Sequence, residues 1–334
     1  MKRHLPVLAA FFVVLGTTAA RAEADWFASL YTGEGIELRA DERVFTLFAL
    51  FNAMGYDDAP LVRKDPLPRY QFHPVRAEVR QKLLAADPSV RAAANNFFDA
   101  HARPMEHYLQ YAVQSAAPPF ATGAKAKELQ DLKGLEGLLA DVYKKWNIGD
   151  LMAQVQSEYR KALRPYLTAI DGPMAKARKL LHVPENGPQS LVVLNLLEAE
   201  NSVHGVMGDG EVVLVVGPSP KPDVEALVAA YAQVFVSDPV SKAARSWAGG
   251  PTLLREAQLL GAQEKTVAEY ATALFSRAVA LKAIDAPDAA YDALAQKGYF
   301  GIKEIAQKFE DQRPVDAWAL DALQKAETRR PAKK

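Results

Sequence analysis

Apolar residues recur at helical spacing along most of the chain and indicate a series of amphipathic helices. The 42–54 segment is the clearest, because its apolar residues form one stripe, Asp41 can cap its start and Gly55 can end it. Prolines stand at or near the start of several others, where a missing backbone N–H costs no hydrogen bond. The helices predicted before residue 180 cover 42–54, 74–86, 88–100, 104–114, 135–146 and 150–170, the last kinked or interrupted at Pro165.

A different pattern appears between residues 190 and 216, where valines and leucines form short β-rich runs. The runs 190–197 and 211–216 are the strongest, and 203–206 is a third run that the tight turn Gly208-Asp209-Gly210 joins to 211–216. After a proline-rich loop, helices are predicted over 223–237, 239–247, 252–260, 264–284, 288–297, 302–310 and 314–326. The pattern therefore predicts an α+β fold, predominantly helical, with a small sheet of about three strands at 190–216 between two helical halves.

The first 22 residues have the order of regions found in a secretory signal peptide. Lys2 and Arg3 precede an almost unbroken apolar run, and Ala20-Arg21-Ala22 forms a small-x-small cleavage pattern. The apolar run of about eleven residues is shorter than the roughly 20 that cross a bilayer. We therefore expect cleavage and export to a periplasm or beyond, with no membrane attachment afterwards. The predicted organisation is a signal peptide at 1–22, a helical region at 23–180, a region with the sheet and further helices at 181–328, and a basic tail at 329–334.

Composition and the absence of known motifs exclude several classes of function. The 40 lysines and arginines balance 40 aspartates and glutamates, whereas a nucleic-acid-binding protein normally carries a basic excess. The absence of cysteine excludes disulfides, thiolate zinc sites and cysteine nucleophiles. The chain also lacks a G-x-S-x-G elbow, an S-x-x-K motif and a phosphate-binding loop, so no motif predicts a cofactor.

The predicted helix over 223–237 has two faces of different character. At about 100° per residue, Tyr231 lies on an apolar face, and Ala229, Ala230 and Gln233 lie on the opposite face. A metal-binding helix needs this layout, because its ligands must lie away from its packing stripe. The alternative is that the alanines only let another helix pack closely, with Gln233 exposed.

This segment resembles the active-site helix of a family of secreted, gluzincin-like metallopeptidases, catalogued mainly as a domain of unknown function. In that family an H-E-x-x-H motif supplies two zinc-binding histidines and a glutamate that polarises the bound water. On the matching register, Ala229 and Gln233 stand at the histidine positions and Ala230 stands at the glutamate position. The resemblance implies a zincin-like scaffold without its catalytic centre, since alanine offers no donor atom and glutamine is a poor zinc ligand.

Two other blocks resemble the same family. Near the start of the expected mature chain, an extended segment with the D-x-R core Asp41-Glu42-Arg43 precedes an apolar helix that ends at glycine. The 270–279 segment, which contains Arg277, resembles the helix that provides the downstream glutamate ligand. The resemblance puts that ligand position near Ala273, with Glu269 one turn earlier as a second candidate.

The leading hypothesis is an exported, catalytically inactive homologue of zinc metallopeptidases that uses no metal or other cofactor. Its cleft is expected between the 211–216 strand and the 229–233 helix face, where it would hold an extended peptide or protein segment by β-addition or be vestigial. The candidate cleft residues are His204, Tyr231, Glu269 and Arg277.

Two other functions stay open at this point. An active hydrolase with a displaced site predicts that His204, Glu269 or neighbouring carboxylates cluster around one pocket. A helical interaction protein unrelated to peptidases predicts that the 223–237 helix packs its alanine face fully against a neighbour and lines no cleft.

Overall fold

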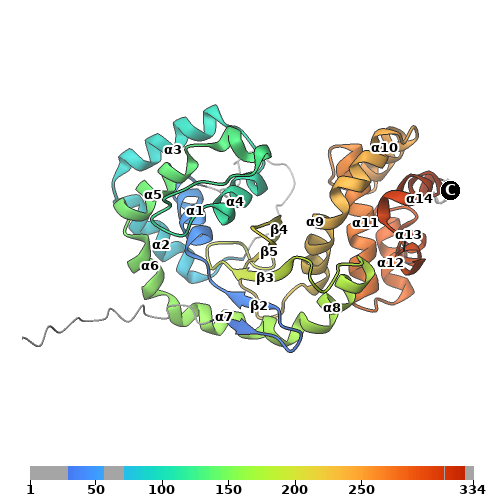
Figure 1. The fold of residues 1–334 in the computed structure, drawn as a ribbon, viewed down its shortest axis with the longest axis horizontal. Helices are drawn as coiled ribbons and strands as arrows, with labels where there is room; N and C mark the ends of the chain where they lie inside the picture. Colours follow the sequence, from blue (N-terminus) through green and yellow to red (C-terminus); the bar gives the residue numbers. More distant parts are fainter. Residues whose placement is uncertain (1–28, 56–70, 312, 328–334) are drawn as a thin grey trace, which may run out of the picture.

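The computed structural model describes residues 29–55, 71–311 and 313–327 (Figure 1). The predicted signal peptide at 1–22 and the basic tail at 329–334 lie outside the described residues. The first group of helices is α1 (Glu42–Ala53), α2 (Pro74–Ala85), α3 (Pro88–Ala100), α4 (Met105–Gln114), α5 (Leu135–Lys145), α6 (Ile148–Gln154), α7 (Gln156–Ala169) and α8 (Asp171–Leu180). The second group is α9 (Val224–Arg245), α10 (Gly250–Leu259), α11 (Val267–Ala283), α12 (Asp288–Gln296), α13 (Ile302–Lys308) and α14 (Ala319–Ala326).

A mixed sheet of five strands lies between helices α1–α6 of the first group and the second group, α9–α14 (Figure 1). The strands are β1 (Leu30–Tyr31), β2 (Glu37–Arg39), β3 (Gln189–Leu194), β4 (Val203–Met207) and β5 (Glu211–Val216), and their order is β1-β2-β3-β5-β4. β2, β3 and β5 run parallel, and β1 and β4 are antiparallel edge strands. The α+β class with a predominantly helical chain is thus confirmed.

The expected strand number was too low, because β1 and β2 come from residues 30–39. Each has only two or three residues, and pairing with a neighbouring strand defines them more than any local pattern does. β2 pairs in parallel with β3, so the sheet joins segments from both sides of the boundary expected at residue 180.

The D-x-R segment ties α1 to α4. Asp41 caps α1 by accepting a hydrogen bond from the backbone N–H of Arg43 at 2.9 Å, and its carboxylate pairs with the Arg43 guanidinium at 2.6 Å. The guanidinium also donates to the carbonyl oxygens of Val113 and Ser115 at the end of α4. Burial raises the pKa of Asp41, but the hydrogen bonds and charge of Arg43 outweigh this effect and lower it. The motif therefore has a structural role in the first group of helices.

α9 and α11 pack against each other along most of their length and run in opposite directions. Trp247, just after α9, stacks on Tyr270 near the start of α11, with ring centroids 6.3 Å apart. At the other end, Val224 and Ala283 line a common cavity. None of the described helices combines the length and apolar character needed to cross a membrane.

Two prolines lie inside helices without interrupting them. α9 continues through Pro239, so the expected helices 223–237 and 239–247 are one, and α7 continues through Pro165. The predicted 150–170 helix is instead divided at Val155. A proline inside a helix costs about 3 kcal/mol, but burial of Val236 and Val240 on either side of Pro239 contributes about 2 kcal/mol each. Tertiary packing thus holds α9 together.

β4 has helices on both faces. His204 points to the side of α1 and α4, where its ring lies 6.4 Å from the ring of Phe48. Gly205 points to the opposite side, because neighbouring residues of a strand alternate. A Cβ atom at Gly205 would lie 2.5 Å from the Ala230 carbonyl oxygen of α9. The missing side chain therefore lets α9 approach the edge of the sheet.

Candidate functional site

A groove of about 680 Å³ lies between α9, α11 and the loop that precedes α11. From α9 it is lined by Ala226, Ala229, Ala230, Gln233, Ser237 and Ser241. From α11 it is lined by Ala268, Glu269, Thr272, Ala273, Ser276 and Arg277. Both helices thus present small side chains along the groove, and the charged side chains of α11 stand among them.

Most of the residues singled out from the sequence meet in this groove. Ala229, Ala230 and Gln233 line one wall, and Glu269 and Arg277 line the other. Ala273, which the resemblance aligns with a metal ligand, lies on the same wall as Glu269. The alanine face of α9 is therefore open to a groove, and it is only partly covered by neighbouring elements.

The strand at the border of the groove is β4, and not the 211–216 strand that the sequence suggests. β5 lies inside the sheet between β3 and β4, whereas Val203 of β4 contributes to the groove lining. Gly217 donates to the carbonyl of Ser202 and Gly208 donates to that of Glu211, so alternate residues of β4 bond to β5. By this alternation, Val203 and Gly205 turn their backbone N–H and C=O groups away from β5.

Arg277 lies over the aromatic ring of Tyr299. Its guanidinium carbon lies 4.6 Å from the ring centroid, and the Tyr299 hydroxyl donates to both Glu264 carboxylate oxygens, at 2.9 and 3.1 Å. Burial, and then the nearby Glu264 carboxylate, outweigh the charge of Arg277 and raise the pKa of Tyr299 to about 12. The hydroxyl is therefore a stable donor at neutral pH. Sequence reasoning missed Tyr299, because it comes from the loop between α12 and α13 and no spacing links it to α11.

Glu269 has a structural contact at the other end of this wall. Its carboxylate accepts a hydrogen bond from the Lys265 N–H at 2.8 Å, while Thr266 caps α11 by accepting from the Glu269 N–H at 3.1 Å. The Glu269 side chain is otherwise exposed to the groove. It therefore gives this end of the groove a negative charge.

Tyr231 does not line the groove. Its side chain is fully buried, and its hydroxyl accepts a weak hydrogen bond from Arg178 at 3.4 Å. Residues 229 and 231 point in different directions because neighbouring helical residues are about 100° apart. Tyr231 is a core residue that packs against Phe235, with ring centroids 5.0 Å apart.

His204 lies on the opposite face of β4 from the groove, in a cluster of charged groups. Its Nε2 is 3.2 Å from a Glu198 carboxylate oxygen and 3.1 Å from the Ser202 hydroxyl, and its Nδ1 is 3.5 Å from Glu106 of α4. Burial lowers the pKa of His204, but the two glutamates outweigh this effect and raise it to about 9. The imidazole is therefore protonated at neutral pH. In that state it cannot remove a proton from Ser202 as a general base.

The described residues contain no group of three or more histidine, aspartate or glutamate side chains that could hold a metal ion. The groove itself offers Glu264 and Glu269, and both carboxylates already accept hydrogen bonds from protein groups. Zinc in catalytic sites is usually held by imidazole nitrogen in addition to carboxylate oxygen, and His204 points away from the groove. The residues present do not fit the zinc ion that the family resemblance would bring.

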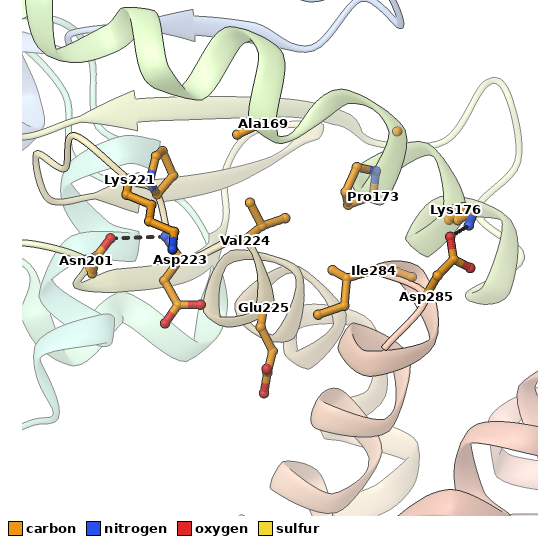
Figure 2. A pocket seen from close by; sticks show the side chains of 13 residues that line it. Ala169, Pro173, Lys176, Asn201, Lys221, Asp223, Val224, Glu225, Ile284 and Asp285 are labelled. Carbon is orange, nitrogen blue, oxygen red and sulfur yellow. Dashed lines mark hydrogen bonds and ion pairs between the residues drawn. The ribbon is translucent and has the colours of Figure 1, made fainter. Parts of the chain in front are cut away.

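A second cavity, of about 830 Å³, lies between α8, the first turn of α9 and the end of α11 (Figure 2). Figure 2 shows Lys176 paired with Asp285 at one side and Asn201 bonded to the backbone of Asp223 at the other. The Asp223 side chain caps α9 through the N–H of Ala226 at 2.9 Å. These polar groups hold elements together, and no residue that the sequence singled out for the cleft lines this cavity.

Comparison of the chain with protein families, curated proteins and solved structures finds no match in any of the three. The resemblance to gluzincin-like metallopeptidases therefore stays a prediction from residues in three blocks.

Proposed function

We propose that this protein is an exported, catalytically inactive homologue of zinc metallopeptidases whose groove between α9 and α11 binds an extended peptide segment. The observation that carries the proposal is that Ala229, Ala230, Gln233 and Ala273 all line the same groove. These are the four positions at which the family resemblance puts two histidines and two glutamates. Spacing already puts the three α9 positions on one face of the helix, but it does not place Ala273 of α11 opposite them.

The edge strand next to the groove supports a peptide as the ligand. Val203 and Gly205 turn their backbone donors and acceptors away from β5, so an extended chain can pair with them. Small side chains on the groove walls leave room for a peptide backbone close to both helices. Binding would then depend on backbone hydrogen bonds, and side chains in the groove would add selectivity.

The two alternative functions have less support. The hydrolase with a displaced site needs His204, Glu269 or neighbouring carboxylates around one pocket. Glu269 faces the other side of β4 from His204, and the glutamates that do surround His204 keep it protonated, so that it cannot act as a general base. The unrelated interaction protein needs the alanine face of α9 to be fully packed, but Ala229 and Ala230 are only half-buried and open to the groove.

Zinc binding by designed variants tests the proposed ancestry. The native protein, purified without its expected signal peptide, should hold far less than one zinc ion per chain by mass spectrometry and should not hydrolyse peptides. The variant Ala229→His/Gln233→His/Ala273→Glu restores three ligands and should bind zinc about tenfold or more tightly than a control with the same histidines and Ala293→Glu. Ala293 is exposed on α12, outside the groove. Equal zinc affinities for the two variants would contradict the register, and stoichiometric zinc in the native protein would contradict the loss of the site.

Blocking the groove tests peptide binding. Ala229→Trp places a large side chain in the groove, so it should weaken binding of a fluorescent random-hexapeptide pool by about tenfold or more, measured by fluorescence anisotropy. The matched control Ala293→Trp puts the same side chain on an exposed helix position elsewhere and should bind the pool as the native chain does. Absence of peptide binding by the native protein would refute this function.

A further inference from the structure

Arg277 stands in the groove as a positioned positive charge without a carboxylate partner. It forms no ion pair within 4 Å with any carboxylate of the described residues. Its guanidinium is nonetheless held by the ring of Tyr299, which is 5% exposed and is itself fixed by Glu264. A guanidinium that is already held against a ring loses less side-chain freedom on binding, and the paired N–H groups of an arginine match the two oxygens of a carboxylate.

Arg277 is the one cation among the described residues that line the groove. Glu269 is exposed on the same wall, and Glu264 accepts from the hydroxyl of Tyr299, the ring over which Arg277 lies. A ligand carboxylate in the groove is therefore attracted by Arg277 and repelled by the two glutamates.

We propose that the groove binds the C-terminal segment of a peptide, with the terminal carboxylate on Arg277. This inference rests on the proposed peptide-binding function and adds the chemistry and direction of the ligand. A terminal carboxylate belongs to the backbone itself. It can therefore reach Arg277 while the preceding residues pair with the edge of β4, whereas a side-chain carboxylate projects away from the strand of the peptide.

Glu225 is a further carboxylate whose charge opposes this arrangement. Burial raises the pKa of Glu225, nearby Asp223 raises it further, and Arg277 and Lys297 counteract both. Glu225 thus interacts with Arg277 electrostatically but does not pair with it. A bound carboxylate has to compete with this longer-range attraction and with that of Glu264, which accepts from Tyr299, and neither glutamate forms an ion pair with the guanidinium.

The test compares two fluorescein-labelled random-hexapeptide pools that differ only at the C-terminus, one as free acid and one as amide. A third pool is amidated but has a glutamate fixed at its fourth position. The native protein should bind the free-acid pool about tenfold more tightly than the amide pool, because a charge-assisted hydrogen-bonded pair is lost on amidation. In Arg277→Gln, both pools should bind with the affinity that the native chain shows for the amide.

Arg255→Gln is the matched control, because Arg255 is an exposed arginine on α10 outside the groove and its loss should leave the acid preference unchanged. Thermal unfolding of Arg277→Gln shows whether the variant is folded. If it is not, Arg277→Lys replaces it, since lysine keeps the charge without the planar donor pair and should reduce the acid preference at least about threefold.

The outcomes separate this inference from the function on which it rests. Equal binding of the acid and amide pools, with binding still blocked by Ala229→Trp, would overturn the role of Arg277 and leave the peptide groove standing. Tight binding of the glutamate-containing amide pool would overturn recognition of the terminus in favour of a side-chain carboxylate. Failure of all three pools to bind would refute both proposals.

Discussion

At the scale of single residues, Gly205 decides how closely α9 approaches the sheet. A Cβ atom there would lie 2.5 Å from a backbone oxygen of Ala230, and a helix backbone cannot move aside as a side-chain end can. Ala230 makes this contact through its backbone and also lines the groove. Gly205 therefore serves the packing of α9 on the sheet, and the alanines of α9 keep the groove open.

Gly205→Ala should lower the free energy of unfolding by about 1–3 kcal/mol, because α9 and β4 must separate to admit the methyl group. The control is Gly137→Ala in α5, where a Cβ atom meets nothing within 4 Å. That substitution should raise the free energy of unfolding by about 0.5–1 kcal/mol, because alanine is the better helix former. Urea unfolding measures both, and a neutral Gly205→Ala would show that this approach is not tight.

The D-x-R segment is another feature that single residues explain. Its aspartate and arginine form a buried cap and ion pair that reach α4. The sequence marks Asp41 as a cap, but the carbonyl groups that Arg43 binds lie about 70 residues further along the chain. Only the folded structure could reveal that contact.

At the scale of elements, the His204 cluster links β4 to α4 and to the loop before β4. Its imidazolium lies between Glu106 and Glu198, with His107 and Ser202 nearby, and Phe48 of α1 packs on its ring. The pKa of His204 is raised in the folded state from an ordinary value of 6.5 to about 9. Its contribution to stability is therefore fully present below pH 6.5 and is lost as the pH rises through 9.

The stability difference between the native chain and His204→Gln should therefore fall between pH 6.5 and 9.5, by an amount on the order of 3 kcal/mol. Urea unfolding at a series of pH values gives this difference directly. His182→Gln is the control, because His182 is not part of the cluster and its substitution should show no such trend in this range. A constant difference for His204→Gln would show that His204 is not charged by its two glutamates.

The continuous α9 shows that local sequence patterns do not always predict where a helix ends. A proline in the middle of a helix predicts an interruption, but α9 passes through Pro239 because its flanking valines are buried. The cap at Asp41, by contrast, could be predicted, and Asp41 accepts a hydrogen bond at the start of α1 as Asp223 does at the start of α9. Capping is a local interaction, and burial depends on partners distant in sequence.

At the scale of the whole molecule, one sheet joins the two groups of helices. β2 comes from the first fifty residues and pairs with β3, and the helices of both groups pack on β4 from opposite faces. A substitution that destabilises one group of helices should therefore destabilise the other as well, and the chain should unfold in one step.

Asp41→Asn tests this coupling. Loss of the buried ion pair should cost about 2–4 kcal/mol and should shift the urea midpoint equally at α1 and at α11, followed by hydrogen-exchange mass spectrometry. The control Asp141→Asn removes an exposed pair with Lys145 and should leave the midpoint nearly unchanged. Unfolding of α1 at lower urea than α11 would show that the two groups of helices are independent.

Most helices, the α+β class and the two faces of the 223–237 segment could be predicted before the fold was known, because spacing and capping act within a few residues. The absence of cysteine likewise excluded cysteine chemistry from the start. The folded chain was needed to learn that β4 forms the border of the groove, that His204 and Tyr231 lie outside it, and that Tyr299 holds Arg277. These facts depend on strand order and on contacts between segments far apart in the chain, and no local pattern of side chains encodes such contacts.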